Sequence, residues 1–171
     1  MNNALRLAAL AASMAVAATP AFAAPVSASP AATATVTIVR SLTLTANQNL
    51  DLGTVVIGNT ITGSETVSLD NAGVLTCGLG VNLTCSGVTQ VAKYTATGST
   101  GQSVVVTVAT SPLLSGANSL TFTPNAHGNV VLAAVAGIGT GKFDLGGAVT
   151  VSGATKDGVY SGDMNVTVDY L

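Results

Sequence analysis

A period of two dominates this sequence: Thr, Val and Ile recur at alternate positions, and Gly and Asn interrupt the runs. In a β-strand, successive side chains point to opposite faces, so such a pattern buries one face and leaves the other in water. Short runs of this kind at fairly even spacing predict an all-β chain folded as an antiparallel β-sandwich. The clearest run is C-terminal, where apolar Met164, Val166, Val168 and Tyr170 alternate with Asp163, Asn165, Thr167 and Asp169.

Eight further runs are expected to form strands. Seven of them resemble the C-terminal run: Ser41–Ala46, Leu50–Ile57, Glu65–Leu69, Lys93–Thr97, Ser103–Ala109, Ser119–Thr123 and Ala148–Ser152. The eighth, Val130–Val135, is continuously apolar, which indicates a strand buried on both faces or one short helix. Turns are predicted at Asn71–Gly73, Gly98–Gly101, Gly146–Gly147 and Asp157–Gly158, where residues that favour turns separate apolar runs.

The first 23 residues have the features of a cleavable secretory signal. Arg6 gives a positive start, Leu7–Ala18 is apolar, and Ala21-Phe22-Ala23 offers the small residues that a signal peptidase requires. An uncleaved membrane anchor is the alternative, but the apolar run is too short to cross about 30 Å of hydrocarbon. We expect export to the periplasm, cell surface or medium. The mature chain is then an extension or first strand over residues 24–39 and one domain over residues 40–171, with no transmembrane segment.

Charge is scarce in this chain. Only 7% of the residues are charged, whereas roughly 25% is typical of soluble domains. Low charge together with 48% hydrophobic residues argues against disorder. A surface of Thr, Ser, Asn and Gly has little self-repulsion and tolerates close association with other subunits. Removal of Arg6 with the signal leaves four Lys and Arg against seven Asp and Glu, which argues against nucleic acid as a partner.

Cys77 and Cys85 are the only cysteines. In an exported protein a disulfide between them is the default expectation. Their closeness in sequence suits a bond within one hairpin. The alternative is a redox-active pair, which would favour two intervening residues instead of seven.

No motif in the sequence predicts catalysis or metal binding, and no cofactor is expected. His127 is the only histidine, and no Gly-x-Ser-x-Gly elbow accompanies it. A zinc site needs three or four His, Cys or acidic ligands, and that set is absent from the sequence. The segment Gly137–Lys142 fails the pattern of a phosphate-binding loop, because Ala136 and Phe143 stand where Gly and Ser or Thr are required. We interpret it as a glycine-rich turn.

The start of the mature chain carries a regular pattern of its own. From Val26 to Ile38 every even position is apolar or Pro, and the odd positions are mostly hydroxylated; the even residues are Val26, Ala28, Pro30, Ala32, Ala34, Val36 and Ile38. One interpretation is a loose tail that leads into the first strand. The other is a donor strand that pairs with a neighbouring subunit by β-strand addition. Pro30 has no N–H to donate, so pairing should weaken or start there.

Four segments carry a family resemblance: residues 143–151 (FDLGGAVTV), 158–162 (GVYSG), 165–170 (NVTVDY) and 50–56 (LDLGTVV). Together they resemble the domain-of-unknown-function 4402 family of small exported proteobacterial proteins, in which Phe is usual where Leu52 stands. The ending is also similar to chaperone–usher pilins and spore-coat-U-like domains. That similarity implies an immunoglobulin-like sandwich, which in pilins is completed by the N-terminal strand of a neighbour.

These observations favour a non-enzymatic structural subunit of a bacterial surface appendage or coat, fimbria-like and assembled by β-strand addition. The even residues Val26, Ala28, Ala32, Ala34, Val36 and Ile38 are the expected donor, and Met164, Val166, Val168 and Tyr170 are an expected wall of the acceptor groove. Expected partners are further copies or related subunits, with a periplasmic chaperone and an outer-membrane usher implied by the pilin similarity. The alternative is a self-complete binding or adhesion module, and an enzyme has only His127 in its favour.

Overall fold

A computed structural model describes residues 23–59, 61–78, 80 and 82–171 of the chain. The predicted signal peptide, apart from Ala23, lies outside the described residues. The chain divides into two units, residues 1–37 and residues 38–171. The described part of the first unit contains no strand and is exposed throughout, and every described strand belongs to the second unit. The described residues include no helix long and apolar enough to cross a membrane.

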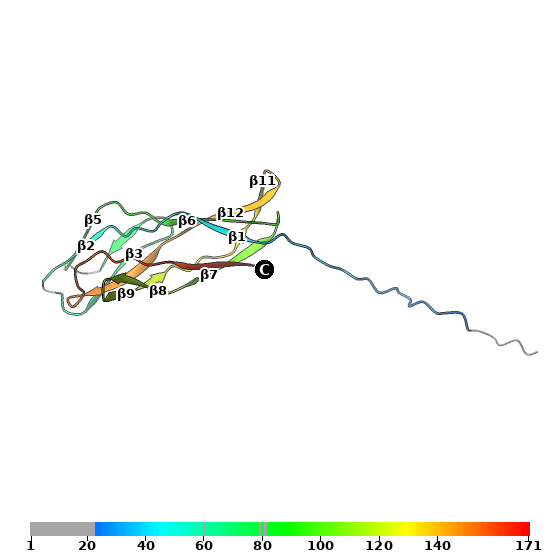
Figure 1. Ribbon diagram of the computed structural model, residues 1–171, viewed down its shortest axis with the longest axis horizontal. Helices are drawn as coiled ribbons and strands as arrows, with labels where there is room; N and C mark the ends of the chain where they lie inside the picture. The colour runs from blue at the N-terminus through cyan, green and yellow to red at the C-terminus, as the bar shows by residue number, and fades with distance from the viewer. Residues whose placement is uncertain (1–22, 60, 79, 81) are drawn as a thin grey trace, which may run out of the picture. The chain divides into compact units, whose positions relative to one another are not determined.

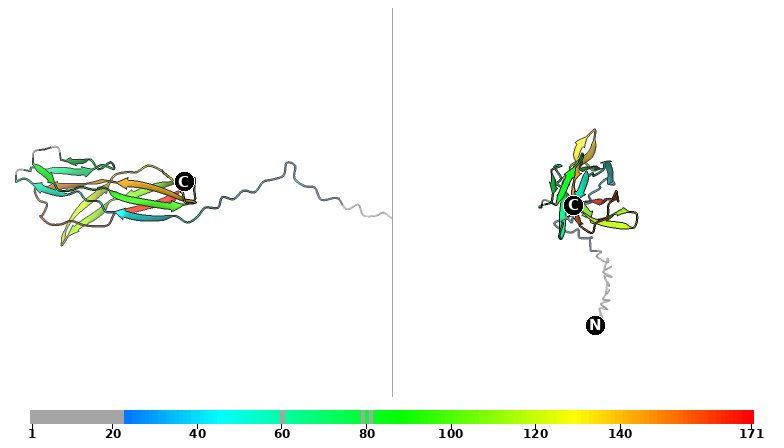
Figure 2. Two further views of the ribbon diagram at one scale, coloured as in Figure 1. Left: turned by 90° about the horizontal axis from the view of Figure 1, so that it is seen from above. Right: turned by 90° about the vertical axis from the view of Figure 1, so that its left-hand side faces the viewer.

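Two antiparallel sheets enclose the first core of the second unit (Figures 1 and 2). One sheet has the order β1 (Thr43–Gln48), β6 (Ala92–Gly98), β12 (Ile138–Leu145) and β11 (Ala133–Val135). The other has the order β10 (Val130–Val131), β7 (Ser103–Ala109) and β14 (Asn165–Tyr170). The buried residues of this core are Ala92, Tyr94, Ala96, Val104, Val106, Val130, Leu132, Phe143 and Leu145.

The remaining seven strands enclose a second core. A five-stranded sheet has the order β4 (Leu75–Cys77), β3 (Ser64–Leu69), β13 (Gly147–Ser152), β9 (Asn118–Pro124) and β8 (Ser111–Ser115). A two-stranded sheet pairs β2 (Thr54–Ile57) with β5 (Leu83–Ser86). The buried residues of this second core are Val67, Leu83, Phe122, Val149 and Val151. Leu50 and Met164 pack against both cores and so join them.

The strand order around the first core follows that of an immunoglobulin-type sandwich, in which strands A, B, E and D form one sheet and C, F and G the other. In chain order, β1, β6, β12 and β11 take the places of A, B, E and D, while β7 and β14 take those of C and F. No described strand lies beside β14 in the place of G. The predicted antiparallel β-sandwich is therefore confirmed, and one edge of it is open.

The chain passes from the first core to the second at Gly146, the single residue between β12 and β13. A Cβ atom at this position would collide with the backbone carbonyl oxygen of Leu69 and lie 2.6 Å from that of Asp70. The side-chain oxygen of Asn71 accepts the N–H of Gly146 at 2.8 Å, and Asn125 donates its own N–H to the Gly146 carbonyl at 3.1 Å. Only glycine fits this crossing point.

Three interpretations of glycine-rich or apolar segments are wrong. Gly137–Lys142 is not a turn: all but Gly137 belongs to β12, and the true turn is Ala136–Gly137. Val130–Val135 is neither a doubly buried strand nor a helix, because it divides into β10 and a fully exposed β11. Gly146–Gly147 joins two strands that run on from one sheet to the next instead of turning back.

The expected strands at residues 103–109, 65–69, 119–123 and 148–152 form within one residue of their predicted bounds. Cys77 and Cys85 form the predicted disulfide, with Cα atoms 5.8 Å apart. They do not share a hairpin, however. Cys77 lies in β4, the edge of the five-stranded sheet, and Cys85 lies in β5 of the two-stranded sheet. The bond therefore links the two sheets that enclose the second core.

We predict that Gly146→Ala lowers the free energy of unfolding by about 3 kcal/mol or more, since the backbone around position 146 must shift to admit a methyl group. Urea unfolding followed by circular dichroism measures this loss. Gly128→Ala is the matched control, because a Cβ at position 128 meets nothing within 4 Å. Equal midpoints for the two variants would contradict the packing argument.

We predict that the double variant Cys77→Ala/Cys85→Ala loses about 2–3 kcal/mol of stability, because a crosslink with a sequence separation of 8 restricts the unfolded chain. The measurement is urea unfolding of the oxidised protein and of the variant. A thiol reductant should lower the midpoint of the unaltered protein to that of the variant and leave the variant unchanged. A reductant-insensitive midpoint in the unaltered protein would rule out this contribution.

Candidate functional site

At the open edge of the sandwich around the first core, a row of apolar side chains is only half covered. Val166, Val168 and Tyr170 of β14 pack against the first core. So do Leu44 of β1, at the edge of the opposite sheet, and Leu42, which precedes β1. All five are partly exposed. We call this set the edge strip.

Burial falls sharply across the β7–β14 ladder. Val106 is 5% exposed and faces Val168, while Val104 is 0% exposed and faces Tyr170. Val168 and Tyr170 are only half-buried although they point into the same core. The difference follows the sheet order: β7 lies between β10 and β14, whereas β7 is the only described strand that pairs with β14. A strand added beside β14 would cover the edge strip.

The backbone of β14 presents hydrogen-bonding groups along the open side. Leu171 donates its N–H to the carbonyl oxygen of Ser103 at 3.2 Å, on the β7 side. In an antiparallel ladder the groups of alternate residues point to opposite sides. Because the N–H of Leu171 points towards β7, the backbone N–H and C=O groups of Val166, Val168 and Tyr170 point to the opposite side, away from β7. The same three residues thus offer apolar side chains to the core and backbone groups to an incoming strand.

One end of the edge strip is closed by three hydrogen bonds among Arg40, Ser99 and Tyr170. The Tyr170 hydroxyl donates to the Arg40 carbonyl at 2.7 Å and accepts the Ser99 N–H at 2.7 Å. Arg40 donates its own N–H to the Ser99 hydroxyl at 2.7 Å. A side chain at Gly98 would collide with the Tyr170 hydroxyl. We call this arrangement the Tyr170 clasp, and no local sequence signal predicts it.

The expected donor residues are all exposed and belong to no described strand. Val26, Val36 and Ile38 are 95%, 82% and 86% exposed, and the Ala residues between them are exposed as well. The expected wall residues, by contrast, gather on one face: Met164, Val166, Val168 and Tyr170 all pack against the first core.

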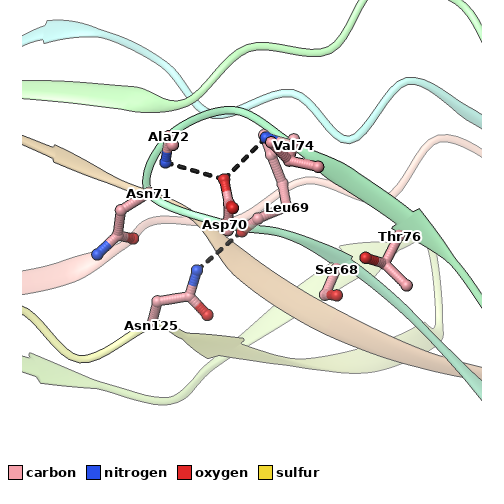
Figure 3. A pocket seen from close by; sticks show the side chains of 8 residues that line it. All are labelled: Ser68, Leu69, Asp70, Asn71, Ala72, Val74, Thr76 and Asn125. Carbon is pink, nitrogen blue, oxygen red and sulfur yellow. Dashed lines mark hydrogen bonds between the residues drawn. The ribbon is translucent and has the colours of Figure 1, made fainter.

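One hollow in the described surface lies at the β3–β4 turn and has a volume of about 440 Å³ (Figure 3). Asp70, Asn71 and Asn125 supply its polar side chains at the turn. Asp70 accepts the N–H groups of Ala72 at 2.9 Å and of Val74 at 2.8 Å through one carboxylate oxygen. Asn125 donates to the Leu69 carbonyl at 2.8 Å.

These bonds give the hollow a structural role. Asn71 also accepts the N–H of Gly146 and donates to the Ala126 carbonyl at 3.2 Å. The side chains therefore shape the turn and hold the β12–β13 crossing in place. In the part of the chain that the structure describes, no three His, Cys, Asp or Glu residues come together as metal ligands.

His127 lies in a loop, and its ring packs against Phe143. Its ring lies 5.1 Å from that of Phe143, at a tilt of 47°, and Nδ1 lies 2.8 Å from the Gly128 carbonyl oxygen. Phe143 in turn stacks on Tyr94 at 5.3 Å, and burial raises the pKa of the Tyr94 hydroxyl. The described residues place no serine hydroxyl or carboxylate in hydrogen-bond contact with His127.

Comparison with known proteins identifies one family. The model of a domain of unknown function, DUF4402, matches residues 42–170, which span the whole sandwich from Leu42 to Tyr170. No curated protein and no solved structure matches the chain. The resemblance noted at residues 50–56, 143–151, 158–162 and 165–170 is confirmed by this match. The chain belongs to the DUF4402 family of domains of unknown function.

Proposed function

We propose that this chain is a non-enzymatic structural subunit of a bacterial surface appendage or coat, exported and assembled by β-strand addition. The observation that carries the proposal is the open edge of β14, where Val166, Val168 and Tyr170 combine half-covered side chains with outward backbone groups. Strand addition to such an edge uses the backbone for affinity and the alternate side chains for specificity.

The donor in this proposal is the segment Val26–Ile38 of another copy or of a related subunit. Its apolar residues fall on even positions, so all of them lie on one face of an extended strand. This spacing matches the edge strip, whose members on β14 are also two residues apart. Pro30 confines ladder pairing to the part that follows it, from Ala32 to Ile38.

An unfilled edge exposes a subunit to aggregation before assembly. A periplasmic chaperone that covers β14, and an outer-membrane usher that orders the addition of subunits, are therefore the proposed partners. The scarcity of charge fits the same role, since closely spaced subunits with few charges repel one another little.

We predict that the mature chain, residues 24–171, forms oligomers that survive unheated detergent gels when it is produced alone in a periplasm. Deletion of residues 24–39 should leave the edge strip empty, abolish the oligomers and lower the urea midpoint. Light scattering coupled to gel filtration measures the mass. Addition of a synthetic peptide of residues 26–38 to the truncated domain should restore the midpoint, and a peptide with Asp at positions 34 and 36 is the matched control.

A stable monomer, with or without residues 24–39, and with no response to the peptide would refute strand addition. The sandwich would then be complete as it stands. In that case a self-contained binding or adhesion module becomes the better description, and a search for its ligand follows.

A further inference from the structure

The Tyr170 clasp affects whether the edge strip can be filled by the Val26–Ile38 segment of the same chain or only by that of a second copy. Arg40 lies two residues after Ile38 and three before β1, and both of its backbone hydrogen-bonding groups are engaged. The N–H is bound by Ser99 and the C=O by Tyr170. Both partners belong to the same end of the sandwich, because Ser99 follows β6 and Tyr170 ends β14.

Insertion of the segment into its own domain requires a sharp reversal at this point. β1 leaves the clasp end at Thr43, which pairs with Thr97 at the end of β6, and it runs away from the clasp. To lie between β1 and β14, Val26–Ile38 must run towards the clasp and reverse within residues 39–42. Those residues form no turn in the structure. A reversal would have to break the bonds that hold Arg40.

We propose, on the basis of the function proposed above, that the Tyr170 clasp prevents a subunit from filling its own edge strip and so directs Val26–Ile38 to a second copy of this chain. Tyr170 and Ser99 act as positioning residues for assembly. They hold both backbone hydrogen-bonding groups of Arg40, so that a reversal of the chain at this residue would have to break their bonds, and they leave the open side of β14 free for the incoming segment.

Insertion of the segment into its own domain competes with insertion into a second copy, and this competition sets how far the monomer fraction should change. A tethered segment that is free to turn back has an effective concentration on the order of 1 mM. A second copy present at about 10 µM is then outcompeted by about a hundredfold. Release of the clasp should therefore convert most of the protein from oligomer to monomer.

Two variants of residues 24–171 test this inference by different means. Tyr170→Phe with Ser99→Ala removes all three hydrogen bonds of the clasp and keeps the aromatic ring in the edge strip. The second variant keeps every side chain and inserts about six Gly and Ser residues between Val39 and Arg40, which gives the segment enough slack to turn back. Tyr160→Phe is the control, because it removes a tyrosine hydroxyl that bonds only the Lys156 carbonyl of its own loop.

The readouts are the monomer fraction at about 10 µM by light scattering and the protease sensitivity of residues 24–39. Support requires an oligomeric parent and control, together with monomeric clasp and linker variants whose segment resists protease. If both variants stay as oligomeric as the parent, the clasp inference is overturned while strand addition stands. A monomeric parent with a protected segment also overturns it. A monomeric parent with a cleavable segment overturns both proposals.

Discussion

The passage of one continuous chain segment through both cores is the constraint on which the rest of the domain depends. β12 contributes Phe143 and Leu145 to the first core, and β13 contributes Val149 and Val151 to the second. Between them the backbone crosses so close to the β3–β4 turn that no side chain fits at Gly146. Because this single residue joins β12, which pairs with β6, to β13, which pairs with β3, the two cores are held next to each other.

Strict alternation made part of this fold predictable from the sequence. β7 and β14 follow the period-two rule, and their predicted apolar faces lie against the core. β12 was missed because its glycines resemble those of a turn. In the structure Gly139 and Gly141 are buried, since a Cβ would meet the Ser99 backbone at one position and the Val130 side chain at the other. Glycine there serves close packing, which a single sequence does not distinguish from turn formation.

The candidate site was predictable only in its local parts. The apolar face of the C-terminal strand follows from spacing alone, whereas that of Val26–Ile38 stays a prediction, because this segment forms no described strand. The Tyr170 clasp does not follow from spacing, because it joins residues 130 positions apart in the sequence and depends on how the ends of β6 and β14 meet. The disulfide shows the same limit: the pairing of Cys77 with Cys85 was predictable, but the link between two different sheets was not.

Side-chain size connects the two halves of the proposed assembly. Val166, Val168, Leu42 and Leu44 of the edge strip are each half-buried against the first core. A strand added there meets a shallow strip, so small apolar residues fit it better than large ones. In the part of the segment proposed to pair, the even positions are Ala32 and Ala34, followed by the bulkier Val36 and Ile38. In the proposed assembly, an edge strip that is half-covered by its own side chains therefore favours the alanine positions of the segment over its Val and Ile.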